Sequence, residues 1–293
     1  MIWYGAGRLW HAVRPIQITE AGISDTKHST SERNTLRVAA YNIAHGRGGT
    51  LGQTNWIHKK PEQVIEQLKK ISRQIIQESP DIIVLNEIDF NAKWSFGIDQ
   101  AQFLAEECGY RYVLKQKNFN VSLPFYNLSF GNALLSRHPI ENPQFLNFSA
   151  YSKYEALLAG DHDGFICDIH TPLGAVSFAG IHLEYRDEPT RIAAAQLFDV
   201  ALSNRPHPLI ALGDFNSTLS ANTNTAMNLL FSKLNYTSAG HSLEPGQPFT
   251  FPASNPKIQI DWIIGKGELK FTNFRAVPSS HSDHLMVIAE VAL

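Results

Sequence analysis

The chain has 293 residues, which is enough to bury a substantial core as one large domain or two small ones. Its contents of 43% hydrophobic and 18% charged residues are ordinary for a soluble globular protein. A formal net charge of −2 argues against strong non-specific attraction to nucleic acid, although it leaves room for a local basic groove.

The cysteines and the N-terminal residues exclude further classes of protein. Cys108 and Cys167 are too few for a disulfide scaffold or a cysteine-only zinc site, and they fit either two free thiols or one disulfide. No window approaches the length of a transmembrane segment. Residues 1–14 lack the continuous apolar stretch of a secretory signal, so we expect a cytoplasmic protein, or an exported one whose signal has been removed.

The first 35 residues show no clear periodicity and are polar from residue 24 to residue 34. We therefore predict an N-terminal arm over residues 1–35 and a folded domain over residues 36–293. The apolar content of residues 36–43 predicts a strand, and a glycine-rich loop follows at residues 44–49. This loop lacks the Lys-Ser/Thr ending of a P-loop, which excludes that kind of phosphate site.

Residues 61–78 give the clearest helix prediction. Val64, Leu68, Ile71 and Ile75 form one apolar stripe, and Ser79-Pro80 ends the pattern. Further on, we predict a buried strand at 81–85, a helix at 99–108 that Gly109 closes, and strands at 110–115 and 130–136.

The second half of the chain alternates strands and helices in the same way. Residues 164–170 and 175–183 flank a turn sequence at 171–174, which predicts a hairpin. A helix is predicted at 189–204, with Ile192, Gln196 and Val200 on one line. A strand at 208–212, a helix at 222–234 and strands at 258–264, 270–276 and 285–291 complete the prediction.

This succession predicts the fold class. Interspersed apolar strands and helices with several hairpins favour two sheets packed together, with helices outside. A single parallel sheet is the alternative, and the hairpins count against it, because parallel neighbours need long crossover connections.

Polar side chains recur where the predicted strands end, and they form a candidate site. They are Asn42, Glu87, His182, Asp214, Asn216, Asp261, Asp283 and His284. One such residue usually caps a turn, but clustered carboxylates raise each other's pKa unless a cation neutralises them. Carboxylate and amide oxygens suit Mg²⁺ or Mn²⁺ better than zinc. With two imidazoles, this set suits attack of water on a phosphoester, whereas no Gly-x-Ser-x-Gly elbow supports a serine hydrolase.

Seven short motifs in order carry a resemblance to a known family. They are Tyr41-Asn42-Ile43, Asn86-Glu87-Ile88, Gly131-Asn132-Ala133-Leu134-Leu135-Ser136, Ile181-His182-Leu183, Gly213-Asp214-Phe215-Asn216, Ile260-Asp261-Trp262-Ile263 and Ser282-Asp283-His284. Over residues 36–293 the sequence resembles the endonuclease/exonuclease/phosphatase superfamily, which has the DNase I-like fold. The resemblance implies an α+β fold, a four-layer α/β/β/α sandwich of two packed, mainly antiparallel sheets with helices outside, and a site at one edge.

The resemblance also implies which residues bind metal and substrate. Glu87 would be the principal ligand of Mg²⁺ or Mn²⁺, with Asn42 beside it and Asp283 near the ion, directly or through water. Asn132 fits a contact with phosphate or, equally, a turn. Outside the matched motifs, Arg186 follows His182 and fits a second phosphate site of the substrate.

The implied catalytic roles fall on five further residues. Asp214 would position or deprotonate the attacking water, or protonate the leaving group. Asn216 would hold a phosphate oxygen, and His182 would donate to the phosphoryl group. His284 would be a general base or a donor to the transition state, oriented by a hydrogen bond from one of its nitrogens to Asp261.

The function implied is a divalent-metal-dependent phosphoester hydrolase, most simply a phosphodiesterase, that uses in-line attack of an activated water. Its substrate would be a small molecule, a lipid headgroup or a nucleic acid, and the enzyme would be a monomer without a transmembrane segment. An endo- or exonuclease acting on DNA or RNA is the alternative, and a metal-independent hydrolase is a third interpretation. A non-catalytic binding protein would be expected to have lost a charged site residue, and none of the matched ones is missing.

Other polar residues carry weaker signals. His45 and Arg47 fit either contact with substrate or a solvated loop, and Asp89 fits a supporting group or a turn cap. Arg191 fits a second phosphate site or a solvent-facing helix position. Asp161-His162-Asp163 resembles a ligand cluster by type, but a polar loop favours solvation there.

Overall fold

A computed structural model describes residues 16–22, 34–123, 126–148, 163–203, 205–240 and 248–292. Within these residues the strands form two sheets. The first contains β1 (Ile16–Glu20), β2 (Leu36–Asn42), β3 (Ile82–Ala92), β4 (Tyr112–Leu123), β5 (Tyr126–Ser136), β12 (Lys270–Val277) and β13 (Met286–Ala292). The second contains β6 (Ile140–Leu146), β7 (Gly164–Thr171), β8 (Gly174–His182), β9 (Leu209–Asp214), β10 (Thr237–Ser238) and β11 (Asp261–Lys266).

Both sheets are mainly antiparallel, with one parallel pair each. The first has the strand order β1-β4-β5-β3-β2-β13-β12, in which β2 and β3 are parallel. The second has the order β10-β11-β9-β8-β7-β6, in which β8 and β9 are parallel. The prediction of two packed sheets is therefore confirmed, and a single parallel sheet is excluded.

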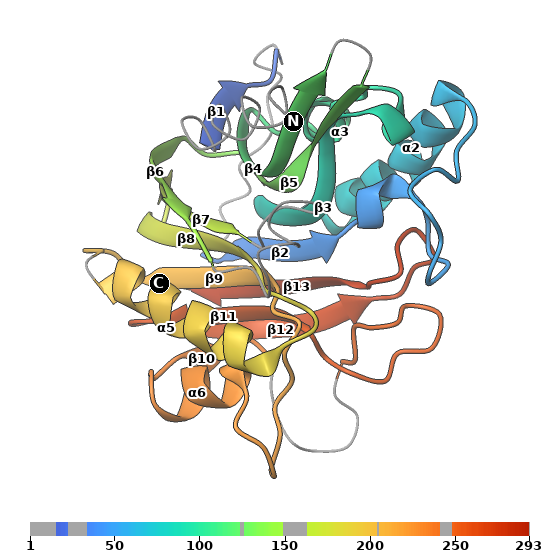
Figure 1. The fold of residues 1–293 in the computed structure, drawn as a ribbon. Coiled ribbons are helices and arrows are strands. Elements are labelled where there is room, and N and C mark those ends of the chain that lie inside the picture. Colours follow the sequence, from blue (N-terminus) through green and yellow to red (C-terminus); the bar gives the residue numbers. More distant parts are fainter. Residues whose placement is uncertain are drawn as a thin grey trace.

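Helices cover the outer face of each sheet (Figure 1). Helices α2 (Pro61–Glu78) and α3 (Gln100–Cys108) lie on the first sheet, and α5 (Glu188–Ser203) and α6 (Ala226–Ser232) lie on the second. Strand alternation divides the apolar side chains between the layers. Along β2, Ala39 and Tyr41 pack towards α2, whereas Val38 and Ala40 pack between the sheets. The result is the predicted α/β/β/α sandwich.

The long helix α2 agrees with its prediction at both ends. Val64, Leu68, Ile71 and Ile75 are buried against the first sheet, as their spacing requires. Ser79 ends the helix in the left-handed conformation, with φ of 47°. The shorter helix α3 begins where the Asp99 carboxylate accepts a hydrogen bond from the backbone N–H of Gln102.

Several strands differ from their predictions. Strand β1, inside the predicted arm, pairs with β4 and so joins the first sheet. Five residues are too short for a periodic signal, and the division of the chain at residue 35 stays a prediction. Strand β3 continues to Ala92 instead of ending at 85, and β6 was not predicted at all. Strand β11 begins at Asp261 rather than at 258, and α6 is shorter than the predicted 222–234.

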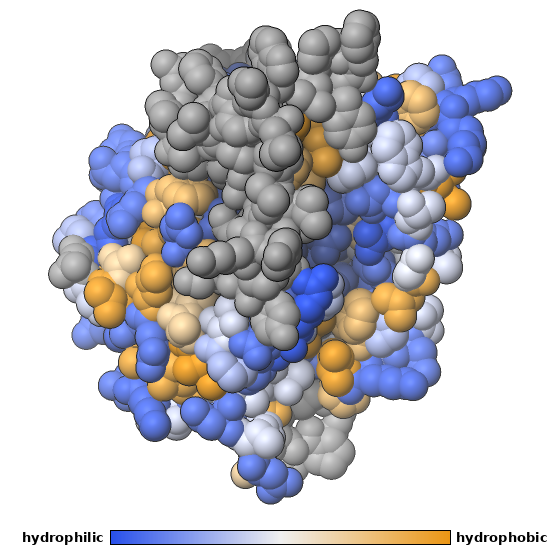
Figure 2. Space-filling view, viewed as in Figure 1, coloured by the Kyte–Doolittle hydropathy of each residue, from blue (hydrophilic) through white to orange (hydrophobic). Residues whose placement is uncertain are grey.

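Helix α5 buries a different face from the one that its apolar line suggests. Val200 is 67% exposed and Leu197 is 42% exposed. The buried face consists of Arg191, Ala194, Ala195, Phe198 and Leu202. Two alanines let the helix approach the sheet closely, and Leu197 and Val200 remain outside. Figure 2 shows hydrophobic surface on the side of the molecule where α5 lies.

The two cysteines are free thiols in separate layers of the core, among the residues that the structure describes. Cys108 packs between α3 and α2, and Cys167 packs between the sheets. The disulfide alternative is therefore excluded. In the described ranges we find no helix that is both long and apolar enough to cross a membrane.

Candidate active site

The pairing of the strands brings distant residues to one edge of the sandwich. The parallel pair of β8 and β9 places His182 beside Asp214, and the antiparallel pair of β11 and β9 places Asp261 beside the same residue. In the other sheet, Asn42 ends β2, and His284 lies just before β13, the antiparallel neighbour of β2. We call the eight predicted residues at this edge the polar cluster: Asn42, Glu87, His182, Asp214, Asn216, Asp261, Asp283 and His284.

Glu87 lies on a bulge in β3 and not after the end of the strand. The pairing with β5 shifts between Leu85 and Ile88, so that Asn86 and Glu87 together face Asn132. Glu87 adopts a positive φ of 49°, which is uncommon for a residue with a side chain. Bulges of this kind change the direction of a side chain, and here the bulge turns the carboxylate towards the edge of the sheet.

Asn86 connects the two sheets and was not predicted as a site residue. Its Nδ2 donates to Asn132 Oδ1 (2.8 Å) and to the backbone oxygen of Ile181 (3.1 Å). Its Oδ1 accepts from the backbone nitrogen of Asp214 (3.0 Å). The residue is fully buried. Its place directly before Glu87, at the end of the apolar run from Ile82 to Leu85, was the signal available in the sequence.

We expect Asn86→Ala to destabilise the fold. The change would leave three buried polar groups without their partner, and each such group costs about 1–3 kcal/mol, so the expected loss is on the order of 3 kcal/mol or more. Denaturant unfolding measures it, with Asn91→Ala as the matched control because Asn91 is exposed on the same strand. Equal stabilities of the two variants would show that Asn86 does not join the sheets.

One carboxylate oxygen lies at the centre of the polar cluster. Oδ2 of Asp214 accepts from Asn42 Nδ2 at 3.1 Å and lies 3.7 Å from His284 Nε2 and 3.9 Å from His182 Nε2. The other oxygen, Oδ1, accepts from the backbone nitrogen of Asn216 at 2.9 Å. The two imidazoles, from distant parts of the chain, therefore face the same atom.

The predicted hydrogen bond between His284 and Asp261 is present. His284 Nδ1 donates to both carboxylate oxygens of Asp261, at 3.1 and 3.0 Å. Asp261 is fully buried, and the ring of Phe251 lies 4.7 Å from the imidazole, centroid to centroid. This arrangement fixes the orientation of the ring and turns Nε2 towards Asp214.

The electrostatics of the site separate an acid from a base. Burial raises the pKa of the Asp214 carboxyl to about 7; the neighbouring Asp261 also raises it, and His284 acts in the opposite direction. Burial alone would lower the pKa of His284, but the carboxylates of Asp261 and Asp214 raise it to about 10. At neutral pH, His284 is therefore a protonated donor, and Asp214 is near the midpoint of its titration.

Glu87 is the partly exposed carboxylate of the polar cluster. Its Oε1 accepts from Asn42 Nδ2 at 3.1 Å, and its side chain is 26% exposed. Oε2 lies 3.7 Å from His45 Nε2 and 3.8 Å from Arg47 Nη1. Burial raises the pKa of Glu87, but His45, His182 and Arg47 outweigh it and hold the pKa at about 2.

His45 is oriented by a pair of hydrogen bonds that Asp89 accepts. His45 Nδ1 donates to Asp89 Oδ1 at 2.8 Å, and Trp94 Nε1 donates to Asp89 Oδ2 at the same distance. The carboxylate therefore holds the imidazole with Nε2 towards Glu87. Asp89 is thus a supporting group rather than a turn cap, and His45 contacts the site rather than solvent alone.

Arg47 forms an ion pair with Asp283. Nη2 donates to Asp283 Oδ2 at 2.9 Å, and the Asp283 side chain is only 5% exposed. Asp283 thus joins the polar cluster through the guanidinium, which also lies near Glu87. Arg47 is therefore not a solvated loop residue, because its guanidinium pairs with a buried carboxylate of the polar cluster.

The donor atoms fit a hard divalent cation at Glu87, whose carboxylate is ionised and accessible. Asn42 Oδ1 accepts from the backbone nitrogen of Ala44 (3.0 Å), so the amide has to turn for its oxygen to face an ion. Oxygens and a ring nitrogen of Asp214, Asp261 and His284 also lie within 4.8 Å of one another. We favour Glu87, because its carboxylate is accessible, whereas those three side chains are buried and His284 Nδ1 is already bonded to Asp261.

The two predicted substrate contacts are placed differently. Asn132 is fully buried, and its Nδ2 donates to Gln116 Oε1 (2.6 Å) and to the backbone oxygen of Asp163 (3.0 Å). The structure does not bring it to the surface where a phosphate would bind. Arg186 has a side chain that is 43% exposed, and its guanidinium carbon lies 4.2 Å from the centroid of the Tyr185 ring.

Two of the weaker candidates are structural. Arg191 is 8% exposed and donates to Glu188 Oε2 from Nε (2.9 Å) and Nη2 (2.7 Å), so it neither faces water nor is open to a phosphate. Asp163 is 1% exposed, and its Oδ1 accepts from the backbone nitrogen of Phe148, which corrects the prediction of a solvated loop there. Residues 161–162 lie outside the described residues.

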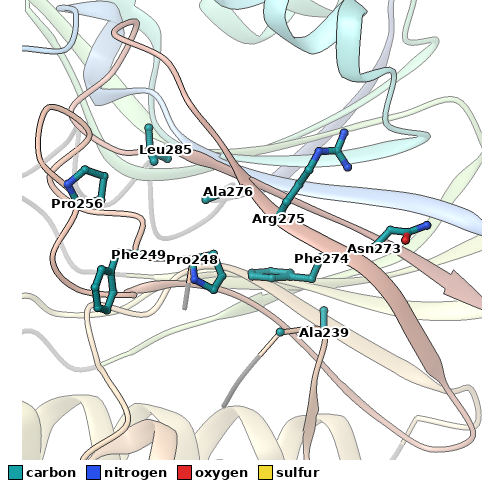
Figure 3. A pocket seen from close by; sticks show the side chains of 10 residues that line it. Ala239, Pro248, Phe249, Pro256, Asn273, Phe274, Arg275, Ala276 and Leu285 are labelled. Atoms are coloured by element: carbon teal, nitrogen blue, oxygen red, sulfur yellow. The ribbon is translucent and has the colours of Figure 1, made fainter. Parts of the chain in front are cut away.

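A cavity of about 670 Å³ opens beside β12 (Figure 3). Figure 3 shows Phe274 next to Pro248 and Ala239, while Arg275 points to the opposite side of the strand. None of the eight residues of the polar cluster lines this cavity, although its lining residue Leu285 directly follows His284. This cavity is therefore not the predicted site.

Comparisons with known proteins give a family and a fold. The model of the Endonuclease/Exonuclease/phosphatase family matches residues 39–284. A comparison with curated protein sequences gives no match.

Solved structures share the fold at low sequence identity. An endonuclease/exonuclease/phosphatase from Beutenbergia cavernae aligns with a TM-score of 0.65 and 20% identity, over 89% of this chain and 72% of that one. A mannosyl-6-phosphatase from Bacteroides thetaiotaomicron gives 0.63 and 15%, over 88% and 100%. The human Nocturnin catalytic domain with a bound sulfate anion gives 0.61 and 21%, over 95% and 99%.

Proposed function

The chain belongs to the endonuclease/exonuclease/phosphatase family, whose members hydrolyse phosphoesters, and from this premise we propose that it is a divalent-metal-dependent phosphodiesterase. The observation that carries the proposal is the surroundings of Asp214 Oδ2. The amide of Asn42 and the imidazoles of His182 and His284 face this single oxygen. The amide can only donate a hydrogen bond, whereas an imidazole can also transfer a proton. Such a set suits in-line attack of water on phosphorus.

Asp214 is the group that takes the proton of the attacking water. Its pKa of about 7 lies near a neutral working pH, where a base combines a large ionised fraction with useful basicity. Asn42 donates to Asp214 and so fixes the direction of the carboxylate. The resemblance leaves open whether Asp214 acts on the attacking water or protonates the leaving group, and we propose the first of these roles.

Donors stabilise the negative charge that develops on the phosphoryl group. His284 is protonated at neutral pH and held by Asp261, so its Nε2 proton is available to a phosphoryl oxygen. His182 faces the same point from β8. Asn216 Nδ2 donates one hydrogen to the backbone oxygen of Leu183 at 2.9 Å, and its second hydrogen serves a phosphate oxygen.

Glu87 would hold Mg²⁺ or Mn²⁺, with Asn42 beside it. When bound, the ion supplies positive charge that polarises the phosphoryl group. His45, fixed by Asp89, would keep the Glu87 carboxylate in place from the opposite side.

A neighbouring cavity supports a substrate that carries a flat or apolar group beside its phosphate. The cavity, of about 500 Å³, is lined by Trp56, His58, Lys59, Asn91, Lys93, Trp94, Phe96, Gly97 and Asn127. The Trp94 ring lies 5.6 Å from that of His45, centroid to centroid, and His45 Nε2 lies 3.7 Å from Glu87 Oε2. Aromatic walls with lysines also suit a stacked nucleobase, so a nuclease acting on DNA or RNA is the second candidate.

A panel of phosphoesters tests the proposal. Purified protein is assayed with Mg²⁺, with Mn²⁺ and with chelator, on nucleic acids, sphingomyelin, inositol phosphates, mannose 6-phosphate and a chromogenic diester. The sugar phosphate is included because a structural neighbour is named a mannosyl-6-phosphatase. We expect hydrolysis of a diester that stops on chelation. Activity that survives complete removal of divalent ions would refute the metal dependence.

We expect Glu87→Gln to weaken metal binding without unfolding the protein. The substitution keeps the size of the side chain and removes the charge that attracts the ion. Calorimetric titration with Mn²⁺ measures the affinity, and hydrolysis at increasing Mn²⁺ concentration measures the dependence. Glu62→Gln, on the exposed first turn of α2, is the matched control. Unchanged affinity and activity would rule out Glu87 as the ligand.

A further inference from the structure

Arg47 reaches two carboxylates of the polar cluster from the loop after β2. Its Nη2 donates to Asp283 Oδ2 at 2.9 Å, and Nη1 lies 3.8 Å from Glu87 Oε2. Nη1 also donates to Asn55 Oδ1 at 3.1 Å. The guanidinium therefore lies between the candidate metal ligand Glu87 and the carboxylate that the family resemblance places near the metal.

The loop is built to hold the guanidinium there. A Cβ on Gly49 would lie 2.4 Å from the backbone oxygen of Ser280, so the absence of a side chain allows the loop to touch the segment that carries Asp283. Gly48 has a φ of 103°, a conformation that other residues rarely adopt. The close contact of the two segments brings Arg47 to Asp283.

The contacts of Arg47 are dominated by charge. Its side chain is 17% exposed and that of Asp283 is 5% exposed, so the ion pair is largely shielded from water. Nε of Arg47 is buried and has no hydrogen-bond partner in the described part of the chain. The guanidinium thus leaves one of its own donors unsatisfied while it neutralises a buried carboxylate, which is costly to bury without a cation.

We propose that the guanidinium of Arg47 occupies a cation position at Asp283, in the place that a second divalent ion would otherwise take. Arginine keeps its charge at every working pH, so this position is permanently filled. The inference rests on the proposed metal dependence, and it sets the number of ions: one divalent ion at Glu87, next to a fixed positive charge. With Arg47 in place, the side chains of Glu87, Asp283 and Arg47 carry a net charge of −1. Removing the guanidinium charge makes this net charge −2, which suits another divalent ion.

A metal titration of Arg47→Met tests the proposal. Electron paramagnetic resonance counts free Mn²⁺ as it is added to the native protein, to Arg47→Met and to the control Arg73→Met. Arg73 lies on α2 with a side chain that is 63% exposed, so the same chemical change there is remote from the site. We expect Arg47→Met to bind one Mn²⁺ more than the native protein. Equal stoichiometry in the two proteins would overturn the proposal, even if the single ion binds more tightly.

A second substitution locates the added ion. In the double variant Arg47→Met with Asp283→Asn, the carboxylate is gone, and we expect the added Mn²⁺ to be lost. An added ion that persists in the double variant would also overturn the proposal, because it would bind elsewhere. If Arg47→Met fails to fold without Mn²⁺, Arg47→Lys takes its place: it keeps the charge, so native stoichiometry supports the proposal and an added ion contradicts it.

These outcomes are separate from those that test the enzyme activity. A protein that hydrolyses no phosphoester but gains an ion on Arg47→Met would refute the proposed function and leave the cation position standing. A metal-dependent enzyme whose Arg47→Met variant binds Mn²⁺ as the native protein does would refute the cation position alone.

Discussion

His284→Ala should lower the rate of phosphoester hydrolysis by on the order of 10² to 10⁴, about 3 to 5 kcal/mol of barrier. The imidazole is protonated at neutral pH, and its Nε2 lies 3.7 Å from Asp214 Oδ2, where a phosphoryl oxygen would meet the attacking water. The substitution removes this donor but leaves Glu87 and Asn42 unchanged. Metal affinity should therefore stay within a small factor of the native value.

Asp261→Asn should lose a large part of the same rate. The carboxylate accepts from His284 Nδ1 with both oxygens, and it is the leading cause of the raised pKa of the imidazole once burial has been overcome. An amide in its place can present an N–H to the ring, which favours the wrong tautomer, and it removes the charge that keeps the ring protonated.

A double-mutant cycle measures whether the two residues act as one unit. We expect the double variant to be scarcely slower than His284→Ala alone, in single turnovers at saturating metal. His170 and Glu141 are the matched control pair, because they form a similar contact of 3.2 Å with both side chains 54% exposed. Losses that add in full would show that Asp261 and His284 work independently.

Local and periodic features of the sequence were sufficient for most of the fold. The stripe of Val64, Leu68, Ile71 and Ile75 predicts α2 with its bounds, because one apolar face meets one sheet. Helix α5 has apolar residues on two faces, so spacing alone does not tell which is buried. Close packing against the second sheet decides which face of α5 is buried, and this packing depends on residues distant in the chain.

The candidate site could likewise be predicted only in part. Because strands of one sheet end at a common edge, residues such as His182, Asp214 and Asp261 could be grouped from strand ends and the family motifs. The bulge at Glu87 could not be predicted, since it depends on register with β5. The contact of Arg47 with Asp283 also lay beyond the sequence, because it depends on a loop packing against a segment more than 200 residues away.

Asp214→Asn should reduce hydrolysis by on the order of 10² to 10⁴ and remove one limb of its pH dependence. The native carboxyl has its pKa raised from 3.8 to about 7, so it is mostly protonated below that pH and mostly ionised above it. A base must be ionised to act. Native activity should therefore rise about tenfold for each pH unit below this pKa and level off above it.

The second limb belongs to the donor. His284 must be protonated to act, and its pKa is raised to about 10, so activity should fall at higher pH. His284→Ala should remove this upper limb, and Asp214→Asn should remove the lower one. The kcat/KM profile of each variant at fixed metal concentration measures the two limbs separately.

The direction of the lower limb distinguishes the two chemical roles of Asp214. If Asp214 protonated the leaving group, it would have to be protonated, and activity would fall as the pH rises through about 7. A cation bound at Glu87 favours the ionised form of Asp214 and so moves the rise in activity to lower pH. The prediction is therefore that activity rises with pH, and it does not depend on the pH of the midpoint. A native profile that falls where we expect a rise, and that Asp214→Asn flattens, would reassign Asp214 as the acid and leave another group to activate the water.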